Sequence, residues 1–167
     1  MSTAAVDLSP VLRLAMLAGV VALLPLSWWW LRQRGAAVRP RLAALTALTL
    51  FLTFDLIVFG AFTRLTDSGL GCPDWPGCYG EAHPLAAHDE IQAAQAAMPT
   101  GPVTVAKAWI EMVHRYLAMA VGLLIVIAAW QGWRQRHRLP HSPAWSWATL
   151  AWVMLQGLFG QIGRAHV

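Results

Sequence analysis

The chain has 167 residues, of which 57% are apolar and only 12% are charged, and its formal net charge is +4. This composition excludes an ordinary soluble domain, in which about a quarter of the residues are charged. The positive charge does not indicate nucleic-acid binding either, because most of the arginines lie between or after apolar runs: Arg32, Arg34, Arg39, Arg41, Arg134, Arg136 and Arg138. Arginine-rich connections between apolar runs are typical of the cytoplasmic side of a membrane protein.

Four apolar runs predict an all-α, polytopic membrane helix bundle, because each approaches the roughly 20 residues that a transmembrane helix needs. The first run, residues 10–31, has its basic residues after the apolar core and lacks a small-residue cleavage site. We therefore expect a retained helix with its N-terminus outside, not a signal peptide. The runs at 42–63, 109–130 and 144–160 are the remaining predicted spans, and membrane lipid is the predicted surrounding.

Residues 64–108 form a long connection that holds most of the acidic residues, which favours the outer side of the membrane. Its first part is dense in Gly and Pro and predicts a series of tight turns. Its second part, residues 89–98, begins with two acids and is followed by Pro99. This pattern predicts a short amphipathic helix.

The outer segment also contains the only two cysteines of the sequence, Cys72 and Cys78. The spacer Pro-Asp-Trp-Pro-Gly between them allows an approach to disulfide distance, and an oxidising periplasm permits the bond. The spacing is not that of a zinc site, and His83 and His88 do not complete one. The bond can be structural or can exchange with a thiol partner; the sequence leaves both alternatives open.

Three ionisable side chains lie in the first turns of the third run: Glu111, His114 and Arg115. Their spacing of three and four residues places them on neighbouring parts of one helix face. One interpretation is structural, with a Glu111–Arg115 ion pair and a hydrogen-bonded His114. The other is a haem site with His114 as an axial ligand, because ionisable groups at membrane depth are candidates for function.

Asp55 lies well inside the second run, and a buried carboxylate has to be protonated or paired. Arg115 is one possible partner, and a structural hydrogen bond between helices is the alternative. No further histidine lies in a predicted span up to residue 160, because His137 and His141 fall in the inner loop. A second axial histidine is therefore expected from outside this sequence.

Three segments of the sequence resemble the N-terminal half of the haem A synthases, which are cytochrome oxidase assembly enzymes of inner membranes. They are GAFTRLTDSGLGCPDWPGCYGE at Gly60–Glu81, KAWIEMVHRYLAMAVG at Lys107–Gly122 and LQGLFG at Leu155–Gly160. The resemblance implies oxidation of the C8 methyl of haem O to a formyl group, which gives haem A. It also implies an eight-helix core of two similar halves, with haem O in the N-terminal half and a b-type haem in the C-terminal half.

The resemblance implies roles for individual residues. His114 matches the first histidine of the N-terminal pair, Glu111 matches the essential glutamate, and Cys72 with Cys78 matches the outer-loop cysteine pair. Arg64 and Arg115 are predicted partners of the haem propionates from their charge and depth. The expected partners are haem O and haem A, haem O synthase, cytochrome oxidase assembly factors and a second copy of the chain.

The resemblance also predicts how the sequence is organised and where it lies. Residues 1–41 are an additional N-terminal helix and cytoplasmic loop, and residues 42–160 are a truncated N-terminal half. The expected location is a bacterial inner membrane, with the N-terminus and residues 64–108 on the periplasmic side. Residues 162–167 match what a common sequencing adaptor encodes before a stop codon, so we expect 161–167 to be an artefact and the fragment to be inactive alone. A genuine short polar tail is the alternative.

Two rival functions remain open. A non-catalytic haem carrier or electron-transfer protein would use His114 without needing a carboxylate beside it, so Glu111 discriminates between a carrier and an enzyme. A thiol-oxidising quinone enzyme would use Cys72 and Cys78, but such enzymes need a second cysteine pair to relay electrons, which this sequence lacks.

Overall fold

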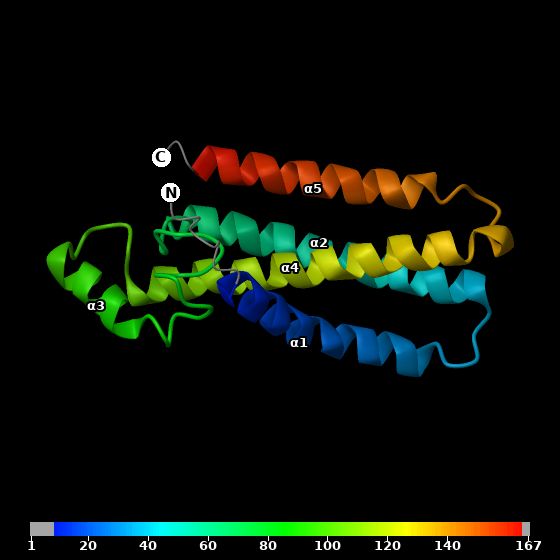
Figure 1. The fold of residues 1–167 in the computed structure, drawn as a ribbon, viewed down its shortest axis with the longest axis horizontal. Coiled ribbons are helices and arrows are strands. Elements are labelled where there is room, and N and C mark those ends of the chain that lie inside the picture. Colours follow the sequence, from blue (N-terminus) through cyan, green and yellow to red (C-terminus); the bar gives the residue numbers. More distant parts are fainter. Residues whose placement is uncertain (1–8, 165–167) are drawn as a thin grey trace, which may run out of the picture. The chain divides into compact units, whose positions relative to one another are not determined.

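The computed structural model describes residues 9–164, with the side chains of residues 9–11, 14 and 161–164 left out. This part of the chain is helical and contains no strand, which confirms the predicted all-α class. Each predicted run coincides with a helix to within about one helical turn at either end. The helices follow one another along the chain (Figure 1) as α1 (Ser9–Arg32), α2 (Val38–Leu65), α3 (His88–Ala97), α4 (Val105–Arg134), the 3-10 helix η1 (Arg136–Arg138) and α5 (Ala144–Arg164).

Three helices in the described part of the chain are long and apolar enough to cross a membrane: α1 over Ala15–Arg32, α2 and α4. With 28 and 30 residues, α2 and α4 exceed the roughly 20 residues that a bilayer requires. The fourth predicted span forms α5, but α5 is not among these three candidates. The chain is therefore a membrane protein with a helical architecture.

The connection between α1 and α2 is shorter than predicted. The predicted basic loop extended to Arg41, but α2 begins at Val38, so Arg39 and Arg41 lie in its first turn. Pro40 does not prevent this start, because the backbone N–H groups of a first helical turn have no partner within the helix. The turn itself contains Gly35 at φ +80°, a backbone conformation that glycine adopts without strain.

The chain folds as two compact units, and α1, α2 and α4 each contribute one part to each unit. Among the described residues, the first unit combines 9–21 with Phe54–Ala120, and the second combines Ala22–Thr53 with 121–164. The core of the first unit gathers around the two cysteines, α3 and the start of α4. Its buried residues are Cys72, Cys78, Ala82, Ala87, Ile91, Ala108 and Met112.

Helix α3 confirms the predicted amphipathic helix of the outer segment. Its Ile91 is buried in the core of the first unit, whereas Met98, just after the helix, is exposed. Asp89 and Glu90 lie in its first turn, where negative charges stabilise a helix. The apolar side of α3 therefore covers the cysteine-containing part of the loop.

The second unit has a separate core of Trp29, Leu45 and Leu124, which come from α1, α2 and α4. Arginine side chains lie over tryptophan rings in this unit, an arrangement typical of a membrane–water interface. The pairs are Arg32–Trp28, Arg34–Trp30, Arg41–Trp29, Arg134–Trp130 and Arg136–Trp133. Arginine and tryptophan side chains thus gather together at the helix ends of this unit.

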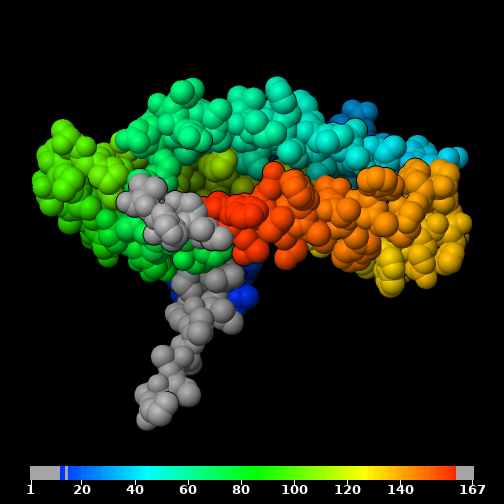
Figure 2. Space-filling view, turned by 90° about the horizontal axis from the view of Figure 1, so that it is seen from above, coloured from blue at the N-terminus to red at the C-terminus, as the bar shows by residue number. Residues whose placement is uncertain are grey.

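Helix α2 leaves a row of large apolar side chains exposed in this chain, and Figure 2 shows the surface of this helix. The row consists of Leu50, Phe51, Phe54, Ile57, Val58 and Phe62. Asp55 lies beside Phe54 and is also exposed. This side of α2 faces outward, so Asp55 is not covered by other residues of this chain; whether it is protonated or paired stays a prediction.

Candidate functional site

Glu111 and Arg115 form a buried ion pair on α4. The Glu111 Oε1 and Arg115 Nη2 atoms are 2.6 Å apart, and the two side chains are only 5% and 9% exposed. They lie four residues apart, so they meet on one face of the helix as the sequence predicts. The carboxylate and the guanidinium thus satisfy each other where neither charge has free access to water.

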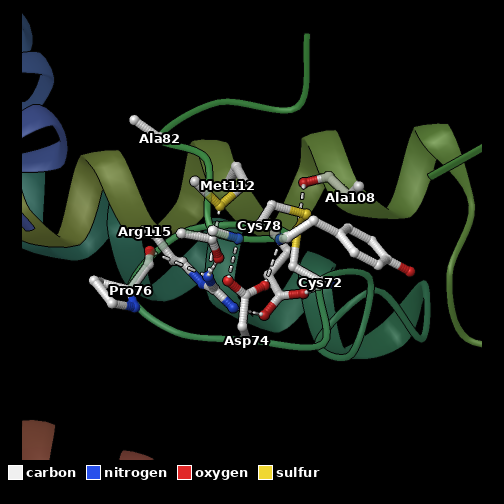
Figure 3. The surroundings of a disulfide bond; sticks show 12 residues. Cys72, Asp74, Pro76, Cys78, Ala82, Ala108, Met112 and Arg115 are labelled. Atoms are coloured by element: carbon white, nitrogen blue, oxygen red, sulfur yellow. Dashed lines mark hydrogen bonds and ion pairs between the residues drawn. A yellow bond between two sulfur atoms is a disulfide. The ribbon is translucent and has the colours of Figure 1, made fainter. Parts of the chain in front are cut away.

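The same two side chains hold the loop between the cysteines (Figure 3). The backbone N–H of Cys72 donates to Glu111 Oε2 at 2.8 Å. Arg115 donates to the carbonyls of Pro76, at 3.3 Å, and Gly77. Both oxygens of the Glu111 carboxylate therefore have partners, and Arg115 connects α4 to the far side of the loop.

Two further contacts extend this attachment beyond the predicted residues. Lys107 Nζ lies 3.1 Å from Asp67 Oδ2 before the cysteine loop, and Tyr116 donates its hydroxyl to the Ala82 carbonyl at 2.6 Å after it. The loop therefore follows α4 in the direction of the helix. The signal that would have found this contact is the spacing of Lys107, Glu111 and Arg115, which form a polar stripe at intervals of four residues.

The cysteine loop is closed by a disulfide and by its own hydrogen bonds. The Cys72–Cys78 sulfurs are 2.06 Å apart and the Cα atoms 5.0 Å apart, which confirms the predicted bond. Asp74 accepts hydrogen bonds from the backbone N–H groups of Tyr79, at 2.5 Å, and Gly80, at 2.7 Å. Both cysteines are buried in the core of the first unit, so a thiol cannot reach the sulfurs without opening the loop.

A glycine permits the close contact between the loop and the start of α4. A Cβ at Gly71 would lie 2.6 Å from the Lys107 carbonyl oxygen and 2.7 Å from the Ala108 nitrogen. These are backbone atoms and cannot move aside as a flexible side chain can. The sequence Gly-Leu-Gly before Cys72 is thus explained by close packing as well as by turn formation.

His114 lies one helical turn after Glu111 on α4 and contacts α2. Its imidazole stacks on the Phe59 ring, with centroids 6.2 Å apart and an interplanar angle of 14°. A Cβ at Gly60 would lie 2.9 Å from His114 Nε2, closer than such contacts occur. Within the described residues the imidazole makes no hydrogen bond, and it is half-buried.

The remaining candidate residues make no hydrogen bond or ring contact with His114 in the described part of the chain. Arg64, near the end of α2, is exposed. His83 accepts a hydrogen bond from the Ala86 N–H and belongs to a turn. A large cavity of about 860 Å³ lies between α3 and the start of α4, and its lining includes Gln92, Gln95 and Thr104 but none of the predicted site residues.

A match to a family model shows which protein family the chain belongs to. The family model COX15-CtaA, described as cytochrome oxidase assembly protein, matches residues 43–164. This chain belongs to the haem A synthase family. Several curated proteins that are named haem A synthase are similar to it. The protein of Shewanella oneidensis is 46% identical over 86 residues, which are 52% of this chain and 26% of the relative.

Two further haem A synthases match a longer part of the chain. The protein of Cereibacter sphaeroides is 34% identical over 143 residues, which cover 79% of this chain and 36% of that relative. The protein of Sinorhizobium medicae is 30% identical over 151 residues, covering 80% and 39%. The chain thus spans about a quarter to two fifths of the length of these family members. No solved structure gives a significant match.

His114 is the described histidine on a membrane-spanning helix, so its surroundings decide whether it can bind a haem iron. An axial haem ligand needs an imidazole nitrogen that is not already used, and His114 makes no hydrogen bond within the described part of the chain. Gly60, which has no Cβ, lets Nε2 pack closely against α2, so the His114 side chain has to turn away from α2 before Nε2 can bind a haem iron. The described residues contain no cluster of three or more His, Cys, Asp or Glu side chains that could hold a bare metal ion. A haem, which brings its own four nitrogen ligands, does not need such a cluster.

Proposed function

We propose that this chain supplies the haem O site of a haem A synthase, with His114 as an axial ligand of the substrate iron. The observation that carries this proposal is the half-buried imidazole of His114, which is held against Gly60 and Phe59 and is free of hydrogen bonds within the described residues. Its location on a membrane-spanning helix supports a membrane-embedded haem. Residues 42–160 carry this site in the proposal.

Glu111 is the proposed catalytic acid–base group. It lies one helical turn before His114, and an ion-paired carboxylate is an acceptor that can take up a proton. Oxidation of a methyl to a formyl group with the oxygen of one water molecule releases four protons and four electrons, and the electrons pass to an external electron acceptor. In the proposal Glu111 receives one of these protons while Arg115 and the Cys72 N–H hold its carboxylate in place.

The two arginines have different roles in the proposal. Arg64 is exposed in α2, one helical turn after Gly60, so its guanidinium is available to pair with a haem propionate. Arg115 would have to leave Glu111 and the loop carbonyls to do so, and the resulting unpaired buried carboxylate would be costly. We therefore assign Arg64 to a propionate and Arg115 to the cysteine loop, which we place on the periplasmic side of a bacterial inner membrane.

A haem carrier is the second candidate function, and one observation favours it. Both carboxylate oxygens of Glu111 are already bound, by Arg115 and by the Cys72 N–H. Glu111 would then serve only to anchor the loop, and no chemistry would follow haem binding. The thiol-oxidising alternative is disfavoured, because the disulfide is buried in the first unit.

The test is to produce the chain in a host that makes haem O but no haem A, and to identify the haems bound to the purified protein by mass spectrometry. Because the chain alone is expected to be inactive, haem conversion is measured in a full-length haem A synthase in which this chain replaces the matching segment, and the variants of Glu111 and Arg115 are made in that protein. Haem A formed by that protein supports the enzyme, whereas bound haem O without haem A supports the carrier. A chain that binds neither haem contradicts both.

Two variants separate a catalytic role of Glu111 from an anchoring role. Glu111→Gln removes the carboxylate charge but keeps an oxygen for the Cys72 N–H. Arg115→Gln breaks the same ion pair but keeps the carboxylate. If Glu111 is catalytic, Glu111→Gln retains bound haem O and forms no haem A, while Arg115→Gln still forms some haem A per bound haem. Equal losses in both variants would show that Glu111 acts only through the loop.

A further inference from the structure

The second unit contains a small polar cavity that the proposed haem site does not explain. Its volume is about 70 Å³, which exceeds the roughly 30 Å³ that one water molecule occupies in the liquid. It is formed where the start of α2 meets the end of α4. The residues that line it are Ala36, Val38, Arg41, Leu42, Gln131 and Gln135.

Arg41 is held in a fixed position at this cavity. Its guanidinium lies over the ring of Trp29, 5.0 Å from the centroid, and Trp29 in turn donates its indole N–H to the Arg41 carbonyl at 3.0 Å. Trp29 is buried, at 4% exposure, so this contact cannot rearrange freely. The Nε atom of Arg41 is buried and has no hydrogen-bond partner among the described residues. A buried unsatisfied donor on a charged group is costly, so a missing acceptor is indicated.

The second unit cannot supply that acceptor as a carboxylate from its own sequence. Residues 22–53 and 121–167 contain no aspartate and no glutamate. They contain eight arginines: Arg32, Arg34, Arg39, Arg41, Arg134, Arg136, Arg138 and Arg164. An anion that neutralises Arg41 within this unit therefore has to come from outside it.

The groups that line the cavity match the chemistry of a phosphate. A guanidinium offers several N–H donors in a planar fork that suits phosphate oxygens. Gln131 and Gln135 add two side-chain amides, neither of which makes a hydrogen bond within the described part of the chain. Exposed tryptophans on the same unit, among them Trp30, Trp130 and Trp133, are typical of the level at which phospholipid headgroups lie.

We propose that this cavity binds the phosphate of an anionic phospholipid headgroup, with Arg41 as the principal ligand and Gln131 and Gln135 as additional donors. The site differs from general attraction between arginines and an acidic membrane, because it requires one particular arginine. Arg39 provides the comparison, since it lies in the same helical turn as Arg41 but is exposed and does not line the cavity.

The experiment is a calorimetric titration of the purified chain in neutral detergent with short-chain phosphatidylglycerol. Phosphatidylcholine and inorganic phosphate are titrated in parallel. We expect Arg41→Gln to weaken phosphatidylglycerol binding at least about tenfold and Arg39→Gln, with the same change of charge, to alter it less than about twofold. Ala36→Leu should also weaken binding, because it fills the cavity without changing any charge. This variant keeps the test valid if Arg41→Gln does not fold.

Several results would overturn the proposal. Equal weakening by Arg41→Gln and Arg39→Gln would indicate attraction to the arginines as a group. Equal affinity for phosphatidylcholine and phosphatidylglycerol, or unchanged binding by Ala36→Leu, would exclude an anion site in the cavity. Binding of inorganic phosphate as tight as that of phosphatidylglycerol, with the same dependence on Arg41, would identify free phosphate as the ligand in place of lipid.

Discussion

Replacement of Gly60 by alanine should weaken haem binding without unfolding the protein. The added Cβ would lie 2.9 Å from His114 Nε2, whereas ordinary van der Waals contacts of a Cβ begin at 3.4 Å. The imidazole must therefore move by about half an ångström, which is the difference between these two distances. Because metal–ligand distances vary by only about 0.2 Å, a haem bound to this imidazole has to move with the ring within its site, which weakens its binding.

Gly60→Ala should lower the affinity for haem and should not lower the stability of the fold. The atom that the new methyl meets is the far end of the His114 side chain, which can rotate away. Alanine also favours a helix by about 1 kcal/mol over glycine, so thermal stability should be unchanged or slightly increased. We expect haem affinity to fall about tenfold or more, equivalent to about 1.4 kcal/mol.

The assay is an absorbance titration of the purified chain with haem, together with a thermal unfolding curve. Gly122→Ala on α4 is the matched control, because a Cβ at Gly122 would meet nothing within 4 Å. Its haem affinity should equal that of the wild type. Tight binding by Gly60→Ala, or an equal loss in Gly122→Ala, would refute the assignment of Gly60 as the residue that makes room for His114.

Three further predictions concern the attachment of the cysteine loop to α4. Arg115→Leu leaves the Glu111 carboxylate buried without its guanidinium and should lower the free energy of unfolding by about 3 kcal/mol or more in chemical denaturation; an unchanged midpoint would contradict the buried pair. Tyr116→Phe removes the hydrogen bond to the Ala82 carbonyl and should cost about 1 kcal/mol in the same assay; a larger loss than in Arg115→Leu would show that the hydroxyl, and not the ion pair, is the stronger attachment. Replacement of both Cys72 and Cys78 by serine should lower the free energy of unfolding by only about 2 kcal/mol, because a disulfide that closes a short loop stabilises less than one that closes a long loop. A variant as stable as the wild type would show that the hydrogen bonds of Asp74 and Arg115 hold the loop alone.

The helices were predictable from the sequence because their signals are local. Apolar runs and arginine-rich connections mark the ends of α1, α2 and α4 to within about a turn, and two acids followed by Pro99 mark α3. The disulfide was predictable for the same reason, since both cysteines and their turn-forming spacer lie in one short segment. The ion pair of Glu111 and Arg115 follows from helical spacing alone.

The contacts that the sequence did not reveal join segments that are far apart in the chain. The carboxylate of Glu111 meets the Cys72 N–H across 39 positions, and Tyr116 meets the Ala82 carbonyl across 34. Nearly every residue has the same backbone N–H and C=O groups, so the sequence does not indicate which of these groups a side chain will bind. The exposure of Asp55 was not predictable either, because a helical period of 3.6 residues does not indicate which side of an apolar helix a neighbouring helix will cover.

The most direct measurement asks whether His114 binds the haem iron. The wild-type chain and the His114→Ala variant are purified with haem, and their absorption spectra are recorded before and after free imidazole is added. We predict that the variant loses the spectrum of histidine-bound haem and that imidazole restores it, because the small ligand can occupy the space left by the side chain. A variant whose spectrum equals that of the wild type before imidazole is added would show that the iron is bound elsewhere, and would contradict the assignment of His114 as an axial ligand.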